Sequence, residues 1–344
     1  MRRARPALFH SVPHQGRQHR SASRLSHAAQ PPTAVADHPV IPTHTPYDGT
    51  SKPFAIGLKQ AEPRDWIELD SHLEAYLSEK NRLYATIPDK VFVAEPDTRA
   101  AQQEVLDLLV AHLIERYPET YRLEGGRCII GGTDRVVDVA NAGDNPLIAA
   151  SKLVQEDLIL MRQGENGWRL TAGSLCFPSS WRLTEKFGKA IHDIHGPVPG
   201  FGPGTRMAEL IARMFDKLAV LVERFNWSIQ ADGSLYHPLS DRQRLARSVE
   251  ADSTFPGADV AAHAFIRVER QTLRKLPVTG DILFTIRIYL DPLAVLARNP
   301  DRAQLAASFA EQLLALDHDQ LDYKGLAADR DRLVGFLNGI ASAG

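Results

Sequence analysis

Residues 153–201 read LVQEDLILMRQGENGWRLTAGSLCFPSSWRLTEKFGKAIHDIHGPVPGF. Two strand-like runs, 154–162 and 168–177, flank the polar turn Gly164–Gly167. Apolar runs of this length on either side of a short glycine-containing turn predict a β-hairpin. We therefore expect two adjacent antiparallel strands here, and the rest of the fold to build on them.

A second hairpin is predicted where residues 264–276 and 281–290 flank the turn Thr279–Gly280, and residues 226–236 resemble another strand. Segments with helical spacing of their apolar residues lie at 69–86, 98–117, 205–225, 302–316 and 330–340. Helices first, an antiparallel sheet in the middle and helices last predict an α+β fold. Strands and helices do not alternate, which argues against a dinucleotide-binding fold.

The composition is that of a soluble globular protein, since 44% of the 344 residues are hydrophobic and 24% are charged. The formal net charge of −2 gives no electrostatic reason to expect nucleic acid or an anionic membrane as a partner. No apolar run approaches the roughly 20 residues that a membrane helix needs. The two cysteines, Cys128 and Cys176, are too few for a disulfide scaffold. We expect a cytoplasmic protein.

The first fifty residues differ in composition from the rest of the chain. They are rich in Arg, His, Pro, Ser and Gln, and the first acidic residue is Asp37. Such a segment buries too little apolar area to offset the entropy of ordering, so residues 1–50 are predicted to be a disordered extension. An organellar transit peptide is the alternative, although the prolines would break its helix. Residues 51–344 are expected to form a single domain.

A histidine-rich segment follows the first hairpin. His192 and His195 are three residues apart, which places both on one side of a helix. A two-histidine metal site would need a third ligand, and Asp193 between them would point elsewhere. One histidine as a haem axial ligand needs only a fixed ring in apolar surroundings, which Ile191, Ile194, Val198 and Phe201 can provide. A structural histidine hydrogen-bonded in a loop is the alternative.

The other reactive side chains of this stretch have ordinary interpretations. Cys176 can serve as a thiolate ligand of haem or pack as a small hydrophobe. Ser179 and Ser180 lack a G-x-S-x-G context, which favours hydroxyls that cap a turn over a nucleophile. Glu156 and Asp157 interrupt an apolar strand, so they lie either at an exposed sheet edge or in a site.

A dense polar group lies on the third predicted strand at Arg267, Glu269, Arg270 and Gln271. Alternation places Arg267, Glu269 and Gln271 on one face of the strand and Arg270 on the other. A buried arginine fork suits carboxylates, including the propionates of haem. A solvated strand face is the alternative.

Several long segments resemble one protein family. They are LVQEDLILM (153–161), AGSLCFPSSWRLTEKFGKAIHDIHGPVPGF (172–201), ERFNWSI (223–229) and RVERQTLRKLPVTGDILFTIRIYLDPL (267–293). Taken in order, they resemble the haem-dependent oxidative N-demethylase alpha-subunit-like proteins. The likeness runs from about Pro53 to about Leu316.

The resemblance implies a PAS-like antiparallel sheet with flanking helices that binds one b-type haem. It implies oxidative demethylation of a small secondary methylamine such as dimethylamine with dioxygen, which gives a primary amine and formaldehyde. Electrons would come from flavin and iron–sulfur modules, and a folate-binding subunit would accept the one-carbon product. This sequence has no cysteine cluster and no dinucleotide fingerprint, so the reductase is expected to be a separate polypeptide.

The resemblance also implies roles for particular residues. The family's Ile-His-x-Pro-Val-Pro motif falls on residues 194–199, which makes His195 the expected iron ligand, held beside Pro197, Val198 and Pro199. Each proline fixes its own φ and lacks an N–H donor, so this backbone is rigid.

Two further family motifs supply the rest of the expected site. The Phe-Pro-Ser-Ser-Trp block falls on Phe177, Ser179, Ser180 and Trp181 and is expected to form a haem-pocket wall with hydroxyl donors. In the Arg-x-Glu-Arg-Gln block, which ends at Gln271, Arg267 and Arg270 are assigned to the propionates or to substrate orientation. Glu156 or Glu269 would manage protons or hold the substrate ammonium. A haem-based sensor without turnover is the alternative function, and a haem-free relative a third.

Overall fold

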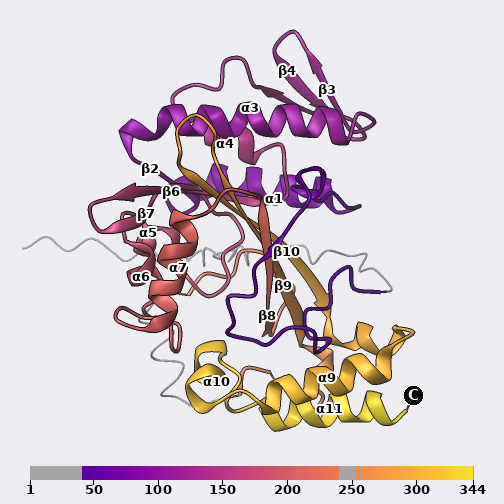
Figure 1. The fold of residues 1–344 in the computed structure, drawn as a ribbon. Coiled ribbons are helices and arrows are strands. Elements are labelled where there is room, and N and C mark those ends of the chain that lie inside the picture. The colour runs from indigo at the N-terminus through magenta and orange to yellow at the C-terminus, as the bar shows by residue number, and fades with distance from the viewer. Residues whose placement is uncertain (1–40, 240–252, 256, 344) are drawn as a thin grey trace, which may run out of the picture. The chain divides into compact units, whose positions relative to one another are not determined.

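The computed structural model describes residues 41–239, 253–255 and 257–343 (Figure 1). Residues 1–40 of the predicted disordered extension lie outside the described residues. Within the described chain, Tyr47 is fully buried, and its ring stacks on Phe309 with the centroids 4.4 Å apart. The domain boundary at residue 50 stays a prediction.

The centre of the fold is an antiparallel sheet of seven strands in the order β1-β8-β9-β10-β6-β7-β2. In chain order the strands are β1 (Lys59–Gln60), β2 (Phe92–Ala94), β6 (Asp157–Gly164), β7 (Gly167–Ser174), β8 (Val222–Gln230), β9 (Phe265–Lys275) and β10 (Ile282–Pro292). The predicted hairpins are β6–β7 and β9–β10, and β10 pairs with β6 to join them. The predicted α+β class is confirmed. The PAS-like character of the sheet stays a prediction.

Four predicted helices are present as α1 (Leu73–Thr86), α3 (Arg99–Arg116), α9 (Arg302–Leu314) and α11 (Arg330–Ser342). The shorter helical segments are η1 (Pro63–Asp65), α2 (Pro88–Val91), η2 (Pro96–Thr98), α4 (Pro146–Ser151), α5 (Leu183–Lys186), α6 (Ile191–Ile194), η3 (Val260–Ala262), η4 (Leu293–Arg298) and α10 (His318–Lys324). A second antiparallel sheet consists of β3 (Tyr121–Glu124), β4 (Arg127–Ile130) and β5 (Arg135–Asp138). No described helix combines the length and apolar character needed to cross a bilayer.

The helix predicted over 205–225 is too long. Helix α7 (Arg206–Asp216) begins at the cap that Thr205 provides by accepting a hydrogen bond from the Ala208 N–H, but it ends well before residue 225. Strand β8 then starts at Val222 and pairs with β9 along its whole length. The apolar residues that follow α7 continue the helical spacing, which is why the prediction ran on to residue 225. Their backbone N–H and C=O groups instead form hydrogen bonds with β9, so this segment is a strand.

The two faces of the large sheet are covered differently. One face carries Leu158, Leu160 and Val268; α3 and α4 pack against it at one end, and α9 and α11 at the other (Figure 1). The other face carries Ile159 and Ile286 and packs against α6 and α7. We call the first the network face, because it carries the ion pairs of Arg270 and Arg287, and the second the cavity face.

Candidate functional site

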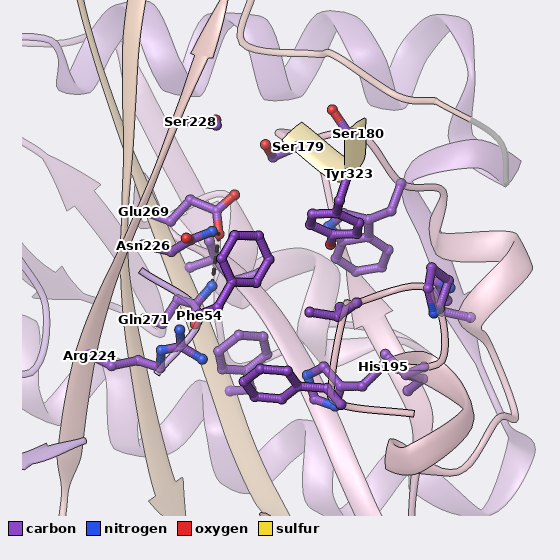
Figure 2. Close-up of a pocket in the computed structure, with 18 of the residues that line it drawn as sticks. Phe54, Ser179, Ser180, His195, Arg224, Asn226, Ser228, Glu269, Gln271 and Tyr323 are labelled. Atoms are coloured by element: carbon purple, nitrogen blue, oxygen red, sulfur yellow. Dashed lines mark hydrogen bonds between the residues drawn. The ribbon is translucent and has the colours of Figure 1, made fainter. Parts of the chain in front are cut away.

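A cavity of about 470 Å³ lies between the cavity face of the sheet and the segment that contains α6 and α7. Its volume is within the range of roughly 300–1,000 Å³ that is typical of sites for small molecules and cofactors. Most of its wall is apolar, formed by Ile159, Met161, Leu170, Ile191, Ile194, Val198, Phe201, Ile211, Met214, Phe215, Leu273, Phe284 and Ile286. Polar side chains enter it from β8, β9 and the histidine-rich segment, as Figure 2 shows.

His195 lies on one side of this cavity, directly after the single turn of α6. Its Nδ1 lies 3.0 Å from the carbonyl oxygen of Ile191, which fixes the ring and makes Nδ1 the protonated nitrogen. No hydrogen-bond partner of Nε2 lies among the described residues. Burial lowers the pKa of His195 to about 4, so the ring is neutral at neutral pH. A neutral imidazole with one nitrogen anchored and the other open is the form that ligates a metal.

The backbone around His195 is held by short local hydrogen bonds. The His195 N–H donates to Ile191 O at 3.1 Å, and the Val198 N–H donates to His195 O at 2.8 Å. His192 is less confined: its side chain is 38% exposed and lies 3.6 Å from Asp193. In the described part of the chain, no three His, Cys, Asp or Glu side chains are grouped as a metal site. A metal site built on His192 and His195 therefore has no third ligand among the described residues.

The opposite wall of the cavity is a polar group on two paired strands. Strand β8 contributes Arg224 and Asn226, and β9 contributes Glu269 and Gln271, with Asn226 opposite Glu269 and Arg224 opposite Gln271. Glu269 Oε2 accepts hydrogen bonds from Gln271 Nε2 at 2.7 Å and Asn226 Nδ2 at 3.5 Å (Figure 2). The two amides thus orient the Glu269 carboxylate inside the cavity.

Arg224 is the residue of this wall that sequence reasoning missed. Its Nη2 donates to Ala55 O at 3.2 Å, and its buried Nε has no partner. Burial lowers the pKa of Arg224, although arginine stays charged in proteins. The signal was present in the sequence, because Arg224, Asn226 and Ser228 alternate as residues on one face of a strand do.

Arg267 shares the cavity face but does not line the cavity. It is fully buried and binds main-chain oxygens: Nη2 donates to Phe177 O at 2.7 Å, and Nη1 donates to Leu235 O at 3.3 Å. Arg267 therefore fastens the Phe177–Trp181 segment to strand β9. Burial excludes the alternative of a solvated strand face for this arginine.

Arg270 and Glu156 lie on the network face, away from the cavity. Arg270 is ion-paired with Glu223 at 2.8 Å and with Glu68 at 3.2 Å. Glu156 Oε1 accepts a hydrogen bond from the Glu68 N–H at 3.1 Å, and burial raises the pKa of Glu156. The structure thus separates these two candidates from Glu269 and His195 by the thickness of the sheet.

The sheet-edge alternative for Glu156 and Asp157 is wrong, because β6 lies between β10 and β7 and both side chains are buried. Asp157 accepts hydrogen bonds at 2.8 Å from the backbone N–H groups of Cys176 and Phe177. Burial raises the pKa of Asp157 to about 6. Asp157 therefore holds the start of the Phe-Pro-Ser-Ser-Trp block in place.

The remaining predicted residues are divided between the cavity wall and the core. The cavity wall includes Ser179, Ser180, Trp181, Pro197 and Val198. Phe177 and Cys176 are buried in the core behind it. Ser180 has a φ of 58°, a left-handed conformation that is uncommon without glycine and that its N–H bond to His237 O helps to hold.

The chemistry of these side chains fits a haem. The cavity combines one open imidazole nitrogen, extended apolar walls and a charged group on the opposite side, which together suit a flat apolar cofactor with an axial ligand. A protein-family comparison agrees with this geometry. The family model described as haem-dependent oxidative N-demethylase, alpha subunit-like, matches residues 57–334 of this chain.

Proposed function

The chain belongs to the haem-dependent oxidative N-demethylase alpha-subunit-like family, and on this basis we propose that it binds one b-type haem and demethylates a small secondary methylamine such as dimethylamine. Dioxygen is the oxidant, and the products are a primary amine and formaldehyde. When bound, haem supplies the redox chemistry of the reaction. The family description as an alpha subunit supports partners that provide electrons, which we propose to be a flavin and iron–sulfur reductase, and a folate-binding subunit for the one-carbon product.

His195 is the proposed iron ligand, and its hydrogen bonding is the observation that carries the proposal. The bond from Nδ1 to Ile191 O orients Nε2 for ligation and raises the electron density of the ring. The low pKa of His195, about 4, keeps protons from competing for Nε2 at neutral pH. Pro197 follows after one residue, Gly196, and limits the movement of this backbone.

Glu269 is the proposed partner of the substrate nitrogen. A secondary amine is protonated at neutral pH, and a carboxylate is the group that binds an ammonium most strongly. The amides of Gln271 and Asn226 both donate to Oε2, which leaves Oε1 for the substrate N–H. Glu269 can therefore hold the ammonium and accept its proton when the amine must react in its neutral form.

The apolar walls have a role of their own. Side chains such as Ile286, Phe284 and Met161 exclude water from the space next to the polar group. In such surroundings the interaction between Glu269 and an ammonium is stronger than in water.

The test is the absorption spectrum of purified protein after haem loading. We expect a Soret band in the unmodified chain and its shift on adding dimethylamine. His195→Ala should lose or greatly weaken haem binding, whereas the matched control His192→Ala should keep it. An unchanged Soret band in the His195→Ala variant would refute the ligand assignment. Haem binding without formaldehyde release, with a reductant supplied, would favour the haem sensor.

A further inference from the structure

Arg224 is a half-buried cation on the cavity wall that forms no ion pair with a described residue. It makes one hydrogen bond to a neutral carbonyl, that of Ala55, and its Nε is buried without a partner. No described carboxylate lies within ion-pair distance of its guanidinium. A buried N–H group of a cation without an acceptor is costly, so the arrangement points to an anionic group that enters from the cavity.

A second cation that lines the cavity, Lys324, has contacts on several sides. Its Nζ donates to Trp227 O and lies 4.4 Å from the centroid of the Trp227 ring and 5.2 Å from that of Phe54. Lys324 is therefore held by groups of the protein itself. Arg224 differs from Lys324 because it keeps a buried N–H group, that of Nε, without an acceptor.

Arg224 and Glu269 face the same cavity and attract each other without forming an ion pair. They are diagonal neighbours on β8 and β9, since Arg224 is opposite Gln271 and Glu269 is opposite Asn226. The Gln271 and Asn226 amides bind the Glu269 carboxylate and so occupy the oxygen that faces them. The backbones of diagonal neighbours in an antiparallel pair are about 7–8 Å apart, so one small ligand in the cavity can reach both side chains.

We propose that Arg224 binds a carboxylate inside this cavity. The inference deepens the proposed function and rests on it. An arginine binds a carboxylate through charge-assisted N–H bonds, and on Arg224 the buried Nε makes no hydrogen bond to a described residue while Nη2 donates to Ala55 O. Two sources can supply the carboxylate. One is a propionate of haem, and the other is a carboxylate on the substrate, which would make the substrate an N-methylated amino acid whose ammonium binds Glu269.

The variants are Arg224→Gln, which removes the charge, and Arg224→Lys, which keeps the charge but loses the fork. Arg213→Gln is the matched control, because Arg213 lies on the exposed side of α7. Thermal unfolding of each purified variant establishes that it is folded. Loss of a charge-assisted hydrogen bond is expected to weaken binding of the carboxylate about tenfold or more, with a smaller loss in Arg224→Lys.

The first arm tests the propionate. Haem and haem dimethyl ester, in which both propionates are neutral, are titrated into haem-free protein and followed by the Soret band. If Arg224 binds a propionate, Arg224→Gln should bind haem about tenfold more weakly than the unmodified chain, while both proteins bind the ester equally.

The second arm tests the substrate. N-Methylglycine and its uncharged relative N-methylglycinamide are titrated by calorimetry into haem-loaded and haem-free protein. If Arg224 binds a substrate carboxylate, the unmodified chain should prefer N-methylglycine about tenfold, and Arg224→Gln should lose that preference without losing the amide.

A dependence on Arg224 in either arm supports the inference and identifies the source. Equal binding of all ligands by the unmodified chain and Arg224→Gln overturns it. Failure of the proposed function looks different, because it would appear as no haem uptake by the unmodified chain. In that case calorimetry on the haem-free protein still decides: an Arg224-dependent preference for N-methylglycine upholds the carboxylate site, and its absence rejects it.

Discussion

The arginines Arg270 and Arg287 on one face of the large sheet differ from Arg224 on the other in how their charge is met. On the network face, Arg270 is paired with Glu223 and Glu68, and Arg287 Nη2 lies 2.6 Å from Asp70 Oδ2. On the cavity face, Arg224 makes no such pair with a described residue. Paired charges are satisfied within the protein and hold elements together, whereas an unpaired charge beside a cavity is ready for a ligand. Buried arginine by itself therefore says little about function until its partners are known.

The network face joins distant parts of the chain. Arg270 also donates to the carbonyl oxygen of Trp66 at 3.1 Å, and Gln155 Nε2 donates to Asp70 at 2.8 Å. These bonds fasten the segment around η1 to the strands β9 and β6. The charged groups of this face are therefore satisfied within the protein.

The largest effect is expected from Arg270→Met. Removing this arginine leaves Glu68 and Glu223 without their shared cation, which should cost roughly 3–5 kcal/mol in the free energy of unfolding. Arg224→Met on the cavity face breaks no ion pair and should cost less than about 1 kcal/mol without ligand. Urea unfolding measures both. If Arg270→Met and Arg224→Met lowered the free energy of unfolding equally, the ion pairs of Arg270 would not distinguish the two faces.

The pH dependence of stability should reveal the network face next. Burial would raise the pKa of Glu68, but its bonds to His44, Arg270 and Tyr289 lower it from 4.5 to about 2. Glu68 therefore binds its proton less readily when folded, so its stabilisation is present above pH 4.5 and is lost as the pH falls toward 2. The loss should be on the order of 2–3 kcal/mol.

Unfolding by urea at a series of pH values tests this. Glu68→Gln should flatten the profile between pH 4.5 and 2. The exposed Glu62, changed to Gln, provides the matched control and should leave the profile as it is. A profile that Glu68→Gln does not alter would show that the carboxylate is not stabilised by its neighbours.

The smallest effect on stability, but a clear one on binding, is expected from Glu269→Gln. The change keeps the size of the side chain and an oxygen for the Gln271 amide, but it removes the charge that an ammonium needs. Dimethylamine should then bind about tenfold more weakly, as measured by the Soret shift of the haem-loaded protein. Unfolding should change by less than about 1 kcal/mol. Undiminished amine binding would remove Glu269 from the site.

Much of the fold could be predicted from the sequence because its signals are local. The two hairpins follow from apolar runs around short turns, and helices α3, α9 and α11 follow from apolar spacing. The overlong helix at 205–225 failed because spacing alone cannot show where a segment begins to pair with a strand far along the chain. That error also hid Arg224, which fell at the end of the expected helix.

The candidate site was predicted in part. His195 was found through the rigid proline segment and the family motif, and Glu269 through alternation on a polar strand. Arg270 was grouped with them because it belongs to the same family motif as Glu269, and Glu156 because it interrupts an apolar strand. Adjacent residues of a strand point to opposite faces, so neighbours in sequence are often separated in space.

The sequence by itself determined the α+β class, the two hairpins and the alternation that puts Arg267, Glu269 and Gln271 on one face of a strand. Only the tertiary structure decided that this face borders the cavity, that Arg267 is used to hold the Phe177–Trp181 segment, and that the Nε of Arg224 is left without a hydrogen-bond partner. The reason is physical: alternation depends on the geometry of one strand, whereas burial, pairing and access depend on which helices and loops pack over each face.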